Sequence, residues 1–207
     1  MTTGQPDKPD HQRPELPEFW DKRFQSGVMP WDAGSVPAAL QAYLQQQEAQ
    51  AAQARSVLIP GCGSAHEAAF LDRRGWSVVA LDFSAAAVEA ARRNLGEWGG
   101  TLVQEDFFAH SPQAPYTLIY ERAFLCALPR KLWSGYGERL MQLLAPGGYL
   151  VGFYLFGDDL KGPPFSISRG QLEELLSPYF DLVADEAVAE SIPAFAGRER
   201  WMEWRKR

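Results

Sequence analysis

The sequence is poor in two features that mark specialised classes of protein: cysteine and long apolar runs. Its 207 residues include only 2 cysteines, Cys62 and Cys126, which lie far apart in the chain. This spacing argues against a disulfide framework and against a zinc or Cys-x-x-Cys motif. No apolar run approaches the roughly 18 residues that a membrane-spanning helix needs. We therefore expect neither a metal site nor a membrane span.

Basic charge is also scarce, because 20 lysine and arginine residues face 26 acidic ones, for a formal net charge of −6. Apart from a short cluster at 205–207 the basic residues are scattered, whereas phosphate binding needs a concentrated positive field. Residues 1–15 are polar and lack the apolar stretch of a signal peptide, so we interpret them as a flexible tail. The composition favours a cytoplasmic protein with a small substrate and no nucleic-acid partner, and we expect a monomer.

Hydrophobic residues make up 46% of the chain, enough for one substantial core, and we expect a single domain over 16–207. Helical and strand-like periods alternate along it, which indicates an α/β fold with a mostly parallel sheet and right-handed crossovers. The predicted helices are 16–24, 37–53, 65–74, 84–95, 131–144 and 169–176, and the predicted strands are 57–60, 78–82, 101–104, 116–120, 149–155, 180–189 and 199–205.

The most informative segment is a Gly-x-Gly turn that follows the strand at 57–60. Gly61 and Gly63 allow a tight turn and a close backbone approach to a ligand, because neither carries a Cβ atom. Asp82 ends the next strand, where a carboxylate can accept hydrogen bonds from both ribose hydroxyls. A strand-to-helix turn without a ligand is the alternative, and the spacing to Asp82 argues against it. The segment predicts a nucleoside site.

The third position of this fingerprint holds His66, where a dinucleotide site usually has glycine or alanine beneath a pyrophosphate. A nicotinamide cofactor is therefore disfavoured, and S-adenosylmethionine, which has a ribose and no phosphate, fits better. Asp82, Asp106 and Glu121 follow three successive strands, although each alone is equally suited to cap a helix. The residues that we expect at the cofactor are Gly61, Cys62, Gly63, Asp82, Phe83, Ser84, Asp106, Phe107 and Glu121.

Eight short segments follow one another in an order and spacing found in one enzyme family. They are Phe19-Trp20-Asp21, Pro30-Trp31-Asp32, Ile59-Pro-Gly-Cys-Gly63, Val79-Ala-Leu-Asp82, Glu105-Asp-Phe-Phe108, Tyr120-Glu-Arg-Ala-Phe-Leu-Cys-Ala-Leu128, Leu144-Ala-Pro-Gly-Gly148 and Gly162-Pro-Pro-Phe165. From about residue 19 to the C-terminus, the chain resembles the thiopurine S-methyltransferase family of class I methyltransferases. It is also similar to the plant thiol and halide methyltransferases within that family.

The resemblance implies a three-layer, Rossmann-like class I methyltransferase fold, whose seven-stranded sheet is mostly parallel with an antiparallel C-terminal strand. It implies S-adenosylmethionine as donor, S-adenosylhomocysteine as product, and a small soft nucleophile as acceptor. A thiol or thiopurine sulfur is the expected acceptor, and a halide or thiocyanate is the alternative. Family cofactor contacts carry over to Trp20 and Trp31, which precede the sheet in a segment with little core of its own. We interpret residues 16–34 as a lid.

Arg122 matches an arginine that borders cofactor and substrate in thiopurine enzymes. Those enzymes typically read Trp-Asp-Arg where this chain has Tyr120-Glu121-Arg122, and the plant halide enzymes lack the arginine. A cation beside the acceptor favours its anionic form, so we predict that Arg122 is catalytic. The alternative is a structural ion pair with Glu121 or Asp106. A nicotinamide oxidoreductase lacks its usual catalytic sets here, and a non-catalytic adenosine-binding protein stays open as a further alternative.

Overall fold

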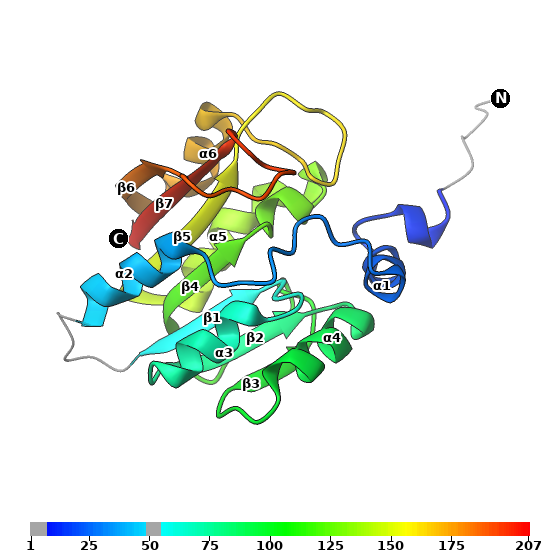
Figure 1. Cartoon of the computed structure of the whole chain (residues 1–207). Helices are drawn as coiled ribbons and strands as arrows, with labels where there is room; N and C mark the ends of the chain where they lie inside the picture. Colours follow the sequence, from blue (N-terminus) through cyan, green and yellow to red (C-terminus); the bar gives the residue numbers. More distant parts are fainter. Residues whose placement is uncertain (1–7, 49–54) are drawn as a thin grey trace.

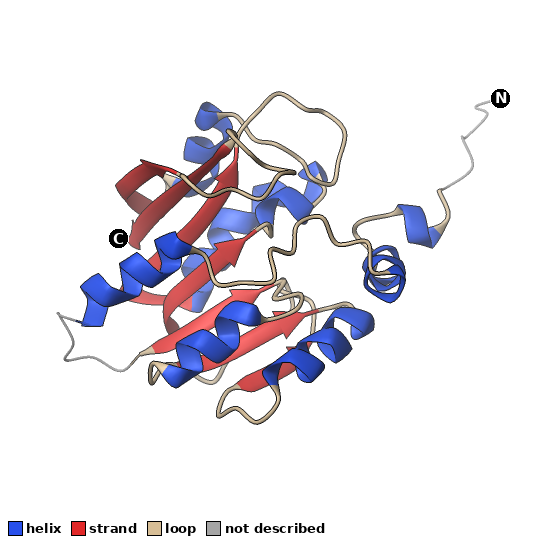
Figure 2. Cartoon of the chain, in the orientation of Figure 1, coloured by secondary structure: helices blue, strands red, loops and turns tan. Residues whose placement is uncertain are grey.

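The computed structural model describes residues 8–48 and 55–207. Its strands form one sheet in the order β3-β2-β1-β4-β5-β7-β6, with helices on both faces (Figures 1 and 2). All neighbouring strands run parallel except β7, which is antiparallel to β5 and β6, so the predicted fold is confirmed. The strands are β1 Ser56–Pro60, β2 Ser77–Asp82, β3 Thr101–Gln104, β4 Tyr116–Arg122, β5 Leu144–Leu155, β6 Phe180–Ala187 and β7 Glu199–Lys206.

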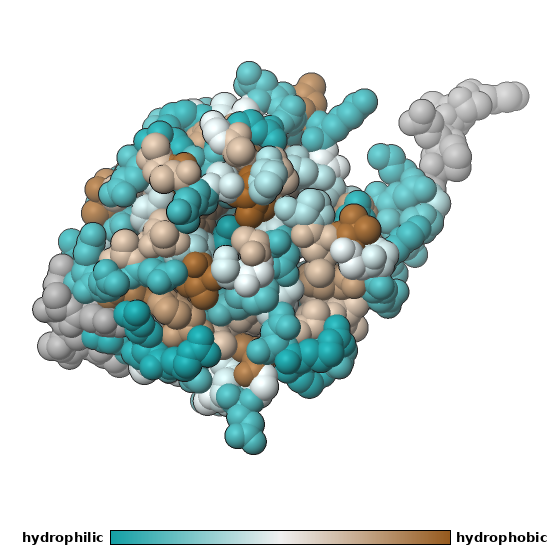
Figure 3. Space-filling view, viewed as in Figure 1, coloured by the Kyte–Doolittle hydropathy of each residue, from teal (hydrophilic) through white to brown (hydrophobic). Residues whose placement is uncertain are grey.

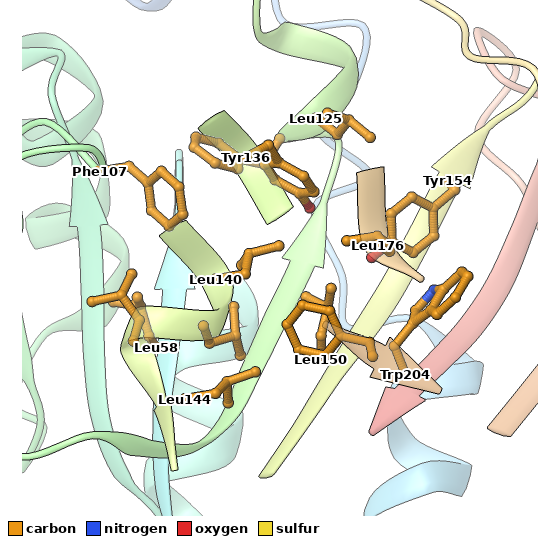
Figure 4. Close-up of a cluster of buried hydrophobic side chains, with 14 of the residues drawn as sticks. Leu58, Phe107, Leu125, Tyr136, Leu140, Leu144, Leu150, Tyr154, Leu176 and Trp204 are labelled. Carbon is orange, nitrogen blue, oxygen red and sulfur yellow. The ribbon is translucent and has the colours of Figure 1, made fainter. Parts of the chain in front are cut away.

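The two faces of the sheet carry separate cores. On β1, Val57 and Ile59 pack with the α2, α3 and α4 layer, whereas Leu58 packs with the α5 and α6 layer. This alternation follows from the strand pleat, and apolar residues on both sides suit a strand covered on both faces. Figure 4 shows Leu58 in the second core with residues of α5 and α6. The helices are α1 Pro17–Ser26, α2 Ala38–Glu48, α3 His66–Arg73, α4 Ala85–Leu95, α5 Tyr136–Leu143 and α6 Arg169–Leu176.

The predicted boundary between one helix and the next strand was wrong. The prediction had a helix over 131–144 and a strand from 149. A 3₁₀ turn over Arg130–Gly135 precedes α5, because glycines at 135 and 137 weaken the helix at its start. β5 begins at Leu144, directly after α5, and residues 145–148 bulge between two paired positions on β4. The Pro-Gly-Gly segment is thus a bulge within a strand rather than the turn before it.

Smaller differences concern element ends. β4 continues two residues beyond its predicted end at 120, and β6 stops at Ala187 instead of 189. The predicted end of the second helix, at 49–53, lies outside the described residues. In the part of the chain that the structure describes, no helix is long and apolar enough to cross a membrane.

The N-terminal segment runs across the carboxyl edge of the sheet. In Figure 1 the blue chain between α1 and α2 passes over the ends of the central strands. Part of the predicted flexible tail, 8–15, is attached: Trp20 donates its indole hydrogen to the Pro14 carbonyl at 2.9 Å, and Lys131 pairs with Glu15 at 2.6 Å. The rest of that tail, 1–7, lies outside the described residues. The attached N-terminal segment therefore begins before residue 16.

Candidate active site

A cavity of about 650 Å³ opens at the carboxyl edge of the sheet, within the size range of small-molecule pockets. Its walls come from the loops after β1, β2, β3 and β4, from the N-terminal segment, and from residues 163–164 and 194–195. The surface on the face shown in Figure 3 is largely hydrophilic, with only isolated strongly hydrophobic residues. The pocket, by contrast, is lined by several aromatic rings, among them Trp20, Phe24, Trp31 and Phe124.

The glycine turn forms the floor of this pocket. Gly61 has φ +58°, and a Cβ atom there would lie 2.6 Å from the Phe124 ring. Gly63 has φ +51°, a left-handed conformation that side chains rarely adopt, and its N–H donates to Asp82. The turn therefore needs glycine both for its backbone conformation and for the space that Phe124 takes up.

Asp82 is the buried carboxyl group of the site, with 7% of its surface exposed. It accepts the N–H of Gly63 at 3.1 Å through Oδ2 and the N–H of Ser84 at 2.9 Å through Oδ1. Burial raises the pKa of Asp82 to about 6, and the two hydrogen bonds only partly offset this. Asp82 lines the pocket, and each of its oxygens has a further lone pair that can accept a hydroxyl donor.

Four further residues predicted at the cofactor also line the pocket: Cys62, Phe83, Asp106 and Phe107. Asp106 accepts the Phe108 N–H at 2.9 Å, which fixes the turn after β3. Phe107 stands edge-on to Phe124 with ring centroids 5.0 Å apart. Burial raises the pKa of the Cys62 thiol, so this group is a neutral wall residue.

Ser84 and Glu121 do not reach the pocket. Ser84 is the N-cap of α4: its hydroxyl accepts the Ala87 N–H at 3.1 Å. Glu121 accepts the N–H groups of Phe124 and Leu125, both at 2.8 Å, and burial raises its pKa to about 8. Because β4 continues past Tyr120, its pleat turns Glu121 to the face opposite Tyr120 and Arg122.

The N-terminal segment holds the glycine loop through Asp32, a residue that the sequence reasoning did not single out as a contact. The Ser64 hydroxyl donates to its Oδ2 at 2.5 Å, and His66 Nε2 lies 3.0 Å from its Oδ1. Burial raises the pKa of Asp32, but hydrogen bonds from Ser64 and Gly34 and the charge of His66 outweigh it, so the net pKa is lowered. Asp32 therefore links the N-terminal segment to the glycine loop as a carboxylate.

The N-terminal segment contributes aromatic rings to the pocket and has a second attachment to the rest of the protein. Trp20 and Trp31 stand edge to face with ring centroids 5.5 Å apart, and both line the pocket. Asp21, on the neighbouring face of α1, accepts the Ser84 hydroxyl at 2.6 Å and the Ala86 N–H at 3.0 Å. These bonds fix α1 to the N-terminus of α4. The segment that carries Trp20 and Trp31 is therefore attached on both sides, through Asp21 and through Asp32.

Arg122 lines the pocket, but its partner is neither of those anticipated. Its Nη1 lies 3.5 Å from Oε1 of Glu67, and its guanidinium lies over the Phe153 ring at 5.2 Å. The same Glu67 oxygen accepts the Tyr120 hydroxyl at 3.2 Å. The ion pair with Glu121 or Asp106 was thus wrong. The sequence did contain one indication that Glu67 lies near the site: it falls in the first turn of the helix that follows the glycine loop.

Within residues 8–48 and 55–207, no group of three or more His, Cys, Asp or Glu side chains is arranged to hold a metal ion.

Similarity to known proteins extends over almost the whole chain. The family model described as thiopurine S-methyltransferase matches residues 16–207. The chain is 29% identical over 193 residues to thiocyanate methyltransferase 1 of Brassica oleracea, covering 90% of this chain and 84% of that protein. It is 26% identical over 191 residues to thiopurine S-methyltransferase of Vibrio atlanticus, covering 84% and 87%. Among solved structures, its fold resembles the 1,6-didemethyltoxoflavin-N1-methyltransferase of Burkholderia thailandensis, with a TM-score of 0.72, 19% identity, and coverage of 99% and 93%.

Proposed function

The chain belongs to the thiopurine S-methyltransferase family, and we propose that it transfers the methyl group of S-adenosylmethionine to the sulfur of a small thiol or thiopurine. One observation carries this proposal: Asp82, the glycine turn and Arg122 all line the same cavity. A nucleoside site and a cation for a soft anion thus open into the same space.

The residues at the turn fit an adenosyl group without phosphate. Asp82 can accept ribose hydroxyls, and Asp106 can accept the exocyclic amine of adenine beside the Phe107 ring. A pyrophosphate on the N-terminus of α3 would meet the Asp32 carboxylate, which already holds Ser64 and His66 there. Like charges in this position argue against a dinucleotide, in agreement with the family.

The cofactor supplies a methyl group activated on a sulfonium, and the protein has to position the acceptor. In-line transfer needs the nucleophile about 3 Å from the methyl carbon, and good orientation supplies most of the acceleration. Trp20 and Trp31 both line the cavity, and aromatic rings there can stabilise the cationic sulfonium. Arg122 orients the acceptor sulfur and favours its anionic form.

The composition supports the remaining parts of the proposal. A net charge of −6 suits a cytoplasmic enzyme that acts on small molecules and binds no nucleic acid, and we propose that it works as a monomer.

The test is a turnover screen with methyl-labelled S-adenosylmethionine and purified protein. The acceptors are a thiopurine, an aliphatic thiol, an aromatic thiol, hydrosulfide, thiocyanate and iodide. We expect methylation of thiol sulfur, binding of S-adenosylhomocysteine by calorimetry, and no binding of NAD. Binding of NAD, or an absence of turnover for every acceptor in a protein that binds S-adenosylhomocysteine, would contradict the proposal.

A further inference from the structure

Glu67 lines the pocket but is not among the residues expected at the cofactor. It lies in the first turn of α3, lines the cavity, and has a side chain only 12% exposed. Oε1 accepts the Tyr120 hydroxyl at 3.2 Å and lies 3.5 Å from Arg122, whereas among the described residues Oε2 has no hydrogen-bond donor. A partly buried carboxylate with one oxygen engaged and the other without a donor has a lone pair that can accept a proton.

The charge around Arg122 bears on what kind of acceptor can approach it. Glu67 pairs with the guanidinium directly, and Glu199 on β7 lies close enough for the Arg122 charge to lower its pKa, although burial, the larger effect, raises it. Two carboxyl groups therefore surround one cation. A preformed anion such as thiocyanate has to compete with Glu67 for Arg122, whereas a neutral thiol does not.

Resting on the proposed function, we infer that Glu67 is the catalytic base of this site, and that the acceptor enters as a neutral thiol. The proton of the thiol moves to the Glu67 carboxylate, and Arg122 changes partner from that carboxylate to the new thiolate. The ion pair is exchanged rather than lost, which keeps a single charge pair in a closed pocket.

The step balances in atoms and charge. The S–H bond of the acceptor breaks and its proton binds Glu67. The sulfur electron pair then forms the new bond to the methyl carbon, while the carbon–sulfonium bond breaks and its electrons return to the cofactor sulfur. The products are a methyl thioether, a neutral cofactor thioether and a protonated Glu67, which loses its proton to water when the pocket opens.

The groups that face Glu67 come from several elements. Tyr120 and Arg122 approach from β4, and the buried thiol of Cys62 approaches from the glycine loop. Burial raises the pKa of Tyr120 well above its ordinary value, so its hydroxyl stays a donor to Glu67. Burial is the largest cause of the raised pKa of Cys62, and the charges of Asp82 and then Glu67 raise this pKa further. None of these neighbours competes with Glu67 as a base at neutral pH.

The experiment compares Glu67→Gln with the unchanged protein on two acceptors, an aliphatic thiol and thiocyanate. The amide keeps an oxygen for the Tyr120 hydroxyl but cannot take a proton. We expect kcat/KM for the thiol to fall at least about a hundredfold, the usual size of general-base catalysis. Turnover of thiocyanate should stay level or rise, because Arg122 has lost its competing carboxylate.

Three further measurements separate a base from a structural residue. Raising the pH toward the solution pKa of the thiol should restore thiol turnover by Glu67→Gln. The substitution should reduce kcat/KM less for the more acidic aromatic thiols than for aliphatic ones. Glu67→Asp should recover part of the thiol activity. Glu89→Gln, which breaks an exposed ion pair on α4, is the matched control and should behave like the unchanged protein.

Equal losses for thiol and thiocyanate, with no dependence on pH or thiol acidity, would overturn the inference and leave Glu67 as support for Arg122. Unchanged thiol turnover in Glu67→Gln would also overturn it, as would an unchanged protein that prefers thiocyanate to thiols. Affinity for S-adenosylhomocysteine reports whether each variant is folded. Failure of the proposed function itself looks different, because the unchanged protein then methylates no sulfur acceptor.

Discussion

The protonation state of Asp82 should control how tightly the cofactor binds. Burial raises its pKa to about 6 in the ligand-free protein, so at pH 5 only about one carboxyl in ten is ionised. Ribose hydroxyls are donors and prefer the ionised form as acceptor. Binding therefore has to expel the proton below pH 6, and affinity for S-adenosylhomocysteine should fall about tenfold between pH 7.5 and pH 5.

Asp82→Asn removes the titrating group and leaves an amide that cannot accept both the Gly63 and Ser84 N–H bonds. The loss of a charged acceptor costs about 1.5–3 kcal/mol, so affinity at pH 7.5 should drop roughly ten- to a hundredfold. The pH dependence should disappear at the same time.

Calorimetry at pH 5 and 7.5, in two buffers of different ionisation enthalpy, measures both the affinity and the proton released. Histidine is the other side chain that commonly titrates in this range, so His66→Gln serves as the control. This variant should keep the dependence of affinity on pH. The reasoning would be refuted if the affinity of the unchanged protein did not change between pH 5 and 7.5, or if Asp82→Asn showed the same dependence on pH.

Three other predictions concern the groups around the pocket. The pKa of Glu121 is raised from 4.5 to about 8, so the stability of the unchanged protein should fall as the pH rises through this interval. Glu121→Gln does not titrate and should therefore be more stable than the unchanged protein at pH 8, by about 1.4 kcal/mol per unit of pKa shift. Urea unfolding measures both free energies, and parallel plots of unfolding free energy against pH for the two proteins would contradict this. Gly61→Ala should cost about 1–3 kcal/mol through its contact with Phe124, whereas Gly170→Ala in the open first turn of α6 should not destabilise the protein; equal melting temperatures would count against the packing argument. Asp32→Asn should weaken binding of S-adenosylhomocysteine by about 1–3 kcal/mol, with Asp10→Asn as an exposed control. Unchanged affinity would show that cofactor binding does not depend on the contact between the N-terminal segment and the glycine loop.

The sheet and the glycine turn could be predicted from the sequence because their signals are local. The β1 run, the turn and the Asp82 strand end lie within about one βαβ unit, and the chain itself fixes their relation. The side chains that complete the site are joined over longer separations. Ser64 meets Asp32 across 32 positions and Tyr120 meets Glu67 across 53. Residue type alone does not say which carboxylate reaches which donor.

Glu121 shows how a small error in an element's end changes a functional assignment. With a strand ending at 120, Glu121 and Arg122 both belong to a loop beyond the sheet, where either can face a ligand. The strand in fact ends at Arg122, and the pleat separates the two onto opposite faces. Burial and two backbone hydrogen bonds then keep Glu121 beneath the site.

The attachments of the N-terminal segment also bear on the order in which the molecule assembles. The segment is synthesised first, but its partners follow much later: Ser64 lies 32 residues beyond Asp32, Ser84 lies 63 beyond Asp21, and Lys131 lies 116 beyond Glu15. These partners lie after β1, β2 and β4 at the carboxyl edge of the sheet, so the surface that the segment docks on exists only once those strands have paired. The sheet is therefore expected to be in place before the segment docks, and the pocket is the last part of the protein to form. By the same reasoning it is the first part to open, through a local fluctuation that leaves the sheet intact.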